Sequence, residues 1–136
     1  MKAITIMQPW ASLVACGAKQ IETRSWATKY RGPIAIHAGL NTKFLRQFYT
    51  QEPFKTALNG VKPRLGYVIA IADLVDCLEI NESQVYYLKL HQEKGISNEY
   101  AFGDYTVGRY AWILANVRQI RPILAKGMQR LWEWKP

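Results

Sequence analysis

The run Tyr67–Leu78 constrains the fold of this chain more than any other segment. It is rich in valine and isoleucine, and no polar residue separates Tyr67 from Asp73. A strand that is apolar at successive positions is typical of a sheet covered on both faces. We therefore expect a central strand over residues 67–78, with the other elements packed around it.

Periodicity and breaker residues predict the remaining elements. Four further strands are expected over residues 3–7, 20–25, 34–37 and 110–120, the last ended by Pro122. Helices are expected over residues 10–16 and 42–49, with a short one within residues 51–64. A further helix is expected to follow Ser83, which would cap its N-terminus. Strands outnumber βα alternations and no glycine-rich phosphate loop follows a strand, which disfavours Rossmann and P-loop folds. The pattern predicts the α+β class, as a small mixed β-barrel with flanking helices.

Size and composition predict one folded domain over residues 1–136, interrupted by a helical connection at about 40–64. The 136 residues are 49% hydrophobic and 21% charged, close to globular averages. No apolar run approaches the roughly 20 residues of a membrane span, and the N-terminus lacks a signal-peptide pattern. We therefore expect a cytoplasmic protein with no membrane partner. The oligomeric state stays open.

The charge balance favours an anionic partner. Lysine and arginine number 18 against 10 acidic residues, a net charge of +8. Such a surplus attracts polyanions such as nucleic acid, although solubility alone would also explain it.

Polar and aromatic residues gather in three short segments that we expect to converge: Gln8–Trp10, Gly17–Trp26 and Gly108–Tyr110. In a strand, Glu22, Arg24 and Trp26 would project to one face and Ile21 and Thr23 to the other. With Lys19 they would form a site that binds anions or holds a base with a shifted pKa. An exposed ion pair on a strand edge is the alternative.

The aromatic residues divide between core and candidate site. Aromatic rings beside lysine and arginine are how single-strand sites stack bases. Trp10 and Trp26 are candidates for a cleft wall, with simple packing equally open, whereas Trp112 is expected in the core.

No metal or cofactor is expected. His37 has no second histidine or cysteine at ligand spacing and is interpreted as a structural residue. Cys16 and Cys77 lie far apart in apolar surroundings and are expected to be buried thiols.

Three motifs together resemble the ASCH family of PUA-like β-barrels. Residues 6–11 have the pattern Ile-x-Gln-Pro-Trp-Ala, residues 17–26 Gly-x-Lys-x-Ile-Glu-x-Arg-x-Trp, and residues 32–38 Gly-x-Ile-x-Ile-His-Ala. The similarity continues through residues 66–77 and 102–112. It covers nearly the whole chain apart from the connection.

The resemblance implies a cleft between the barrel and the first helix, and a role in RNA recognition or metabolism. We interpret the chain as binding RNA or a nucleoside in a basic cleft. The expected binding residues are Gln8, Trp10, Lys19, Glu22, Arg24, Trp26, Arg109 and Lys126. Lys126 belongs to a Lys-Gly-x-Gln tail similar to the family's. Two roles stay open for this tail: its lysine would add to the basic rim of the cleft, or the tail would hold the C-terminus against the barrel.

The alternative is a small hydrolase of an RNA-derived substrate, similar to the family's N4-acetylcytidine amidohydrolases or to its single-strand ribonuclease-like members. Lys19 and Glu22 would then be catalytic. The amidohydrolases carry a threonine three residues after their lysine, where this chain has Glu22. Thr23 is one residue away, and a slip of one residue in a strand points a side chain to the opposite face.

Overall fold

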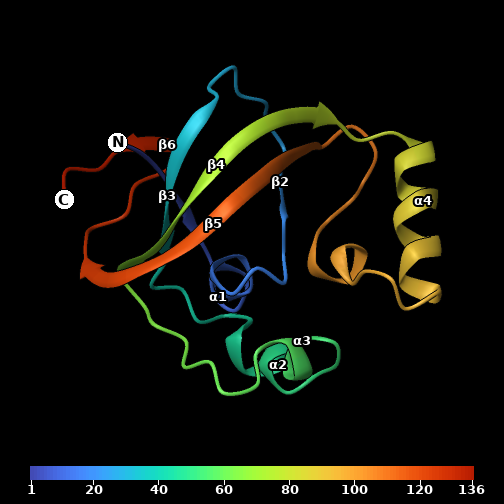
Figure 1. The fold of residues 1–136 in the computed structure, drawn as a ribbon, viewed down its shortest axis with the longest axis horizontal. Coiled ribbons are helices and arrows are strands. Elements are labelled where there is room, and N and C mark those ends of the chain that lie inside the picture. The colour runs from blue at the N-terminus through green and yellow to red at the C-terminus, as the bar shows by residue number, and fades with distance from the viewer.

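A computed structural model describes residues 1–136 and shows one curled sheet with helices around it (Figure 1). The sheet order is β2-β5-β4-β3-β1-β6, and only β1 and β3 pair in parallel. The two outer strands do not pair with each other, so the sheet is a half-barrel. The α+β class is confirmed. The strands are β1 (Lys2–Ile6), β2 (Ile21–Arg24), β3 (Gly32–Ala38), β4 (Tyr67–Glu79), β5 (Tyr110–Leu124) and β6 (Leu131–Glu133).

β4 is central, as its apolar run predicts, and it lies between β3 and β5. Val68 is fully buried in a cluster with Trp132, and Ala70 and Ala72 are fully buried in the main core on the opposite face of the sheet. Further along, Val75 is 51% and Leu78 41% exposed. Burial on both faces therefore holds only for the first half of β4, because the long strand runs past the elements that cover its start.

Pro122 does not end the last long strand, contrary to the sequence prediction. β5 continues to Leu124 and pairs through Ile123 with Val68 of β4, beyond a register shift between Val68 and Ala70. Proline lacks an N–H donor and is tolerated at a bulge or a free edge. Both conditions hold, because β2 covers the other edge of β5 only from Tyr110 to Ile113.

The main core lies between α1 (Trp10–Ala15) and the sheet. It joins Ala11 and Val14 of the helix to Ile4, Ile36 and Trp112 of three strands, and Trp112 is in the core as predicted. Gly17, with a φ of +85°, then turns the chain from α1 toward β2, a conformation that glycine adopts without strain.

The remaining helices lie at two sides of the sheet (Figure 1). α2 (Leu45–Tyr49) and α3 (Phe54–Ala57) form the connection below α1, and α4 (Glu82–Glu93) and the 3-10 turn η1 (Glu99–Phe102) stand to one side. Asn81 caps α4, with Gln84 completing a reciprocal pair of hydrogen bonds. Ser83 lies inside the first turn, so its predicted capping role is wrong.

The cysteines are both free thiols. Cys16 is exposed and Cys77 is half-buried, so the expected burial is wrong. The cause at Cys16 is its position just past the end of α1, beyond the residues that face the sheet. None of the helices is both long and apolar enough to cross a bilayer.

A hydrogen-bonded latch holds the C-terminal segment. The Trp132 indole N–H donates to Thr5 Oγ1 over 3.1 Å, and Thr5 Oγ1 lies 3.1 Å from His37 Nδ1. His37 Nε2 lies 2.8 Å from the Ala125 carbonyl, which can only accept, so Nε2 carries the proton and Thr5 donates to Nδ1. His37 is thus satisfied structurally, as its sequence context predicts.

Gly127→Ala should loosen this latch. A Cβ at Gly127 would lie 2.7 Å from His37 ring atoms and from Thr5 Oγ1, closer than van der Waals contact allows. We expect the free energy of unfolding to fall by about 1–3 kcal/mol in urea denaturation. Met128→Ala, at an exposed neighbour, is the control, and equal stability of the two variants would contradict the expectation.

Candidate functional site

A cleft of about 530 Å³ opens between β2, the helices of the connection and the segment after η1. Its lining joins aromatic side chains on one wall to charged side chains on the other. The aromatic wall comprises Trp10, Phe44, Phe48 and Phe54, and the charged wall Glu22, Arg24, Asp104 and Arg109.

The aromatic wall is one interlocked cluster. The Trp10 ring centroid lies 5.2 Å from that of Phe48, 5.9 Å from Phe44 and 6.3 Å from Phe54. Such edge and tilted contacts are the favoured aromatic geometries. Trp10 therefore both packs and lines the cleft, so the two roles left open for it are compatible.

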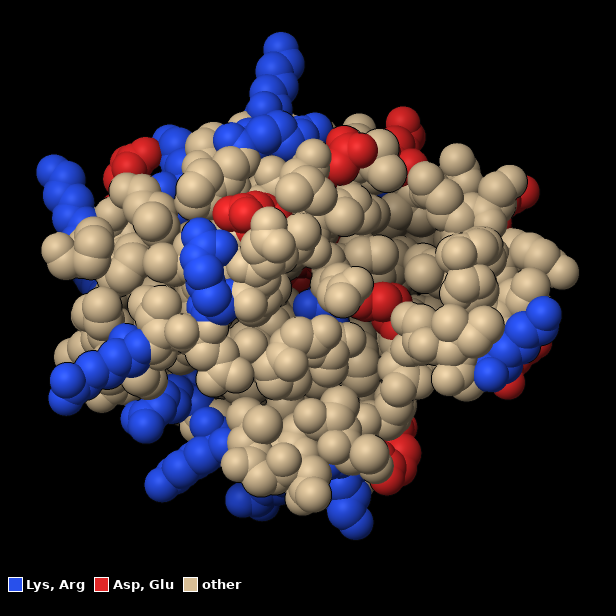
Figure 2. Space-filling model, viewed as in Figure 1, with Lys and Arg blue, Asp and Glu red and all other residues tan.

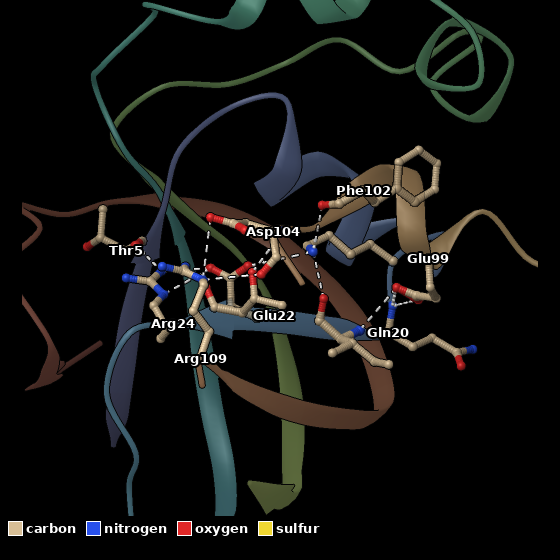
Figure 3. Close-up of polar contacts among 11 residues, drawn as sticks. Thr5, Gln20, Glu22, Arg24, Glu99, Phe102, Asp104 and Arg109 are labelled. Atoms are coloured by element: carbon tan, nitrogen blue, oxygen red, sulfur yellow. Dashed lines mark hydrogen bonds and ion pairs between the residues drawn. The ribbon is translucent and has the colours of Figure 1, made fainter. Parts of the chain in front are cut away.

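Glu22 and Arg24 project to the same face of β2, as strand alternation predicts. Arg24 donates to Glu22 Oε2 from Nε over 3.1 Å and from Nη2 over 2.8 Å. Arg24 Nη2 also donates to the Thr5 carbonyl over 2.9 Å, which ties β2 to β1 (Figure 3). The guanidinium is thus rigidly oriented, and its side chain remains 22% exposed beside the cleft.

Arg109 and Asp104 form a second ion pair next to the first (Figure 3). Arg109 Nε lies 3.5 Å from Asp104 Oδ2 and donates to the Asp104 carbonyl, while Nη2 donates to the Thr23 carbonyl. The pKa of Asp104 is lowered, chiefly by its hydrogen bond from Thr106, with Arg109 adding to the effect. Two guanidinium groups, one from β2 and one from the turn before β5, therefore share one cleft.

Thr23 also lines the cleft, although strand alternation predicts the opposite face. It is 8% exposed, and its hydroxyl accepts a hydrogen bond from the Asp104 backbone N–H over 3.2 Å. The reason is that β2 is an outer strand, and the segment before β5 folds over its edge.

Lys19 lies beneath the cleft and does not line it, with only 1% of its surface exposed. Its Nζ donates to the Ile21 carbonyl over 2.6 Å and to the Phe102 carbonyl over 2.9 Å. Glu22 Oε1 lies 3.7 Å away. Burial lowers the pKa of Lys19, and the carboxylates of Glu22 and Glu99 act in the opposite direction.

Glu99, at the start of η1, makes the corresponding contact in the opposite direction, from its side chain to the backbone next to Lys19. Its carboxylate accepts from the backbone N–H of Gln20 over 2.6 Å and from that of Ile21 over 3.3 Å (Figure 3). Burial raises the pKa of Glu99, while the Gln20 N–H and Lys19 oppose the rise. Each segment thus places a charged side chain on the other's backbone, and we call this pair of contacts the clasp.

Besides Lys19, three other residues predicted for binding lie outside the cleft lining. Gln8 is fully buried, where it accepts from the Ser12 N–H and donates to the Arg64 carbonyl, so it anchors α1 to the connection. Trp26 packs edge-on against Trp112 at 4.8 Å, with the Arg130 guanidinium over its ring. Lys126 is exposed, and it does not line the cleft.

Sequence reasoning missed most of the aromatic wall. Phe44, Phe48 and Phe54 come from the helical connection, which the family resemblance does not cover, yet they complete the cleft. The signal available was the helical spacing of Phe44 and Phe48. Glu99 and Asp104 carry no comparable signal, since isolated acidic residues in a polar segment are indistinguishable from solvated ones.

The cleft is charged but not basic, which corrects the expected basic cleft. Each of its arginines is paired with a carboxylate, and a hollow in the middle of the face in Figure 2 has atoms of both signs at its bottom. Figure 2 shows lysine and arginine gathered instead along the margin opposite α4 and near α2 and α3. The surplus positive charge therefore lies outside the cleft, at that margin and around the connection.

Lys19→Met should change how stability depends on pH. The folded chain holds the Lys19 proton less tightly than the unfolded chain, whose pKa is near 10.5. Stability of the unsubstituted protein should therefore rise as pH increases toward 10.5, by at most about 1.4 kcal/mol per pH unit for one proton. Urea denaturation at pH 8, 9 and 10 measures this slope.

The methionine variant should lack that rise, while Lys94→Met, at an exposed lysine of ordinary surroundings, should keep it. If the stability of all three proteins depended on pH in the same way, the claim that burial lowers the pKa of Lys19 would be contradicted.

Comparison with known proteins identifies the family. The family model of the ASCH domain matches residues 4–124. Activating signal cointegrator 1 of Homo sapiens is 28% identical over 96 residues, which are 66% of this chain and 16% of that protein. Its Mus musculus counterpart is 29% identical over 100 residues, 69% of this chain and 17% of that protein. This chain thus spans about a sixth of those relatives.

The fold agrees with the same assignment. The crystal structure of ASCH from Zymomonas mobilis superposes with a TM-score of 0.53 over 90% of this chain and 72% of that one, at 20% identity. Because the family model covers most of the chain and the half-barrel matches, this chain belongs to the ASCH domain family.

Proposed function

We propose that the cleft binds one nucleotide of a single-stranded RNA, with its base against the aromatic wall and its phosphate at Arg24 and Arg109. The observation that carries this proposal is the joint presence of two oriented guanidinium groups and four aromatic rings in one cleft. Aromatic faces stack bases, and guanidinium groups bind phosphate oxygens in a planar fork. The likeness of the ASCH family to RNA-binding PUA domains supports the same reading.

The dimensions favour a single strand. A cleft of about 530 Å³ lies within the range of small-molecule pockets and would hold one nucleotide, whereas a duplex would remain outside. Recognition of RNA by sequence uses bases that are splayed out of a strand in this way.

The connection supplies a path for the rest of the strand. Residues 40–64 carry five basic residues and one acidic residue, Glu52. A second groove of about 800 Å³ lies along the same connection, lined by Arg46 and Lys62. α2 separates the two hollows, with Phe44 and Phe48 lining the cleft and Leu45 and Arg46 the groove. An RNA strand that crosses α2 from the cleft to the groove would therefore keep its phosphates close to basic side chains.

Binding is favoured over hydrolysis at this site. Lys19, one of the two residues expected to be catalytic in the hydrolase alternative, uses its Nζ for two backbone carbonyls and lies beneath the cleft lining. The other, Glu22, is paired with Arg24. Incubation with N4-acetylcytidine tests the alternative, and acetate release that Lys19→Met abolishes in a folded protein would support it.

The double variant Arg24→Gln with Arg109→Gln should weaken binding of a single-stranded RNA oligonucleotide by about tenfold or more, because it removes two charge-assisted contacts. Fluorescence anisotropy measures the change. The control is Arg31→Gln with Arg118→Gln, since these arginines are also paired with carboxylates but do not line the cleft. Equal losses in the two double variants would contradict the proposal, and thermal unfolding verifies that both are folded.

Replacing Lys43, Arg46 and Lys62 by serine should reduce the salt dependence of RNA binding. Each phosphate contact that is lost lowers the slope of log K against log salt by about 0.7 for a single strand. Replacing Lys89, Lys94 and Lys2 should leave the slope nearly unchanged, because these residues lie outside the connection. A slope that depends only on the number of cations removed would exclude the proposed path.

A further inference from the structure

A third hollow, the α4 groove, lies on the sheet face opposite the main core. Ala111 and Trp112 are neighbours on β5, and Trp112 belongs to the main core while Ala111 joins a separate cluster with Ile80 and Tyr105. α4 covers this cluster incompletely and leaves a groove of about 360 Å³. Its main lining residues are Ile21, Leu78, Ile80, Tyr87, Leu88 and Ile113.

The α4 groove exposes apolar surface that the fold does not use. Tyr87 is 57% and Leu78 41% exposed, and eight of the ten lining residues are hydrophobic. Tyr105 also lines the groove, and its hydroxyl is buried with no hydrogen-bond partner.

The charges around the α4 groove are acidic. Residues 65–117 contain seven acidic and three basic residues, the reverse of the balance in the chain as a whole. Glu79 lies between two lining residues and Glu82 next to a third, and neither forms an ion pair. Of the three basic residues, Arg109 is paired with Asp104 and Lys89 lies over the Tyr100 ring. The third, Lys94, follows the end of α4, six residues beyond Leu88, the last residue of that helix that lines the groove.

We propose that the α4 groove is a docking site for a cationic protein segment that inserts a bulky apolar side chain. An apolar pocket bordered by uncompensated carboxylates complements that chemistry, since the pocket buries the side chain and the carboxylates attract the flanking cations. The same charges repel nucleic acid. This site lies on the other sheet face from the cleft and does not depend on its proposed function.

The test uses the full chain and three synthetic decapeptides. The first has a central leucine–tryptophan pair flanked by lysine and arginine, the second has glutamate in place of the basic residues, and the third has alanine in place of the apolar pair. Methyl NMR follows Ile21 and Ile113 in the α4 groove and Ile4 in the main core. The first peptide should shift the two groove methyls and leave Ile4 in place, with affinity about tenfold or more above either other peptide.

Matched variants distinguish specific docking in the α4 groove from nonspecific binding of the peptide elsewhere on the surface. Tyr87→Ala should weaken binding of the first peptide by about tenfold, because a groove wall is removed. Tyr86→Ala should not, since Tyr86 is 69% exposed on the same helix but does not line the groove. Glu79→Gln with Glu82→Gln should reduce affinity for the first peptide only. RNA binding should be unchanged in all three variants.

Other results would overturn the proposal. These are equal binding of the cationic and acidic peptides, equal losses in Tyr86→Ala and Tyr87→Ala, or no groove shift with any peptide. Groove shifts that appear on raising the protein concentration alone would indicate a second copy of this chain as the occupant. Groove shifts caused by single-stranded RNA would indicate a nucleic-acid surface.

Discussion

The clasp between residues 19–21 and 99–102 is the constraint on which the site depends. The Lys19 ammonium satisfies two buried carbonyls, and the Glu99 carboxylate satisfies two backbone N–H groups of the opposite segment. Burying either charge alone would be costly, and their proximity to each other and to Glu22 offsets that cost. Because the clasp fixes Phe102 against β2, it also sets the floor of the cleft.

Charge compensation shapes what the cleft can bind. Arg24 and Arg109 are oriented by carboxylates, so an incoming phosphate meets a preorganised but partly neutralised pair. The carboxylates weaken the nonspecific attraction of the cleft for anions, and they hold the guanidinium groups in a defined orientation. The uncompensated cations of the connection lie outside, where they attract a polyanion over a longer range. The acidic side near α4 opposes that attraction, so the molecule has two electrostatically distinct faces.

Local sequence patterns predicted some elements correctly and others wrongly, and each wrong prediction has a physical cause. The apolar run of β4 and the alternation of Glu22 and Arg24 are properties of a strand alone, so the sequence predicts them. Pro122 lies inside β5 because a bulge and a free edge remove the need for its N–H donor. Thr23 reaches the cleft because an outer strand is wrapped by a distant segment. Neither cause is visible within a window of neighbouring residues.

By itself, the sequence determined the α+β class, the central strand, the positive charge and the position of the Lys19–Arg24 motif, because these follow from periodicity, composition and short-range spacing. Tertiary structure alone decided that Lys19 is buried, that Phe44, Phe48 and Phe54 form the wall facing Arg24, and that the surplus cations lie outside the cleft. The physical reason is that burial and charge pairing depend on contacts between segments far apart in the chain, such as Lys19 with Phe102, 83 residues away.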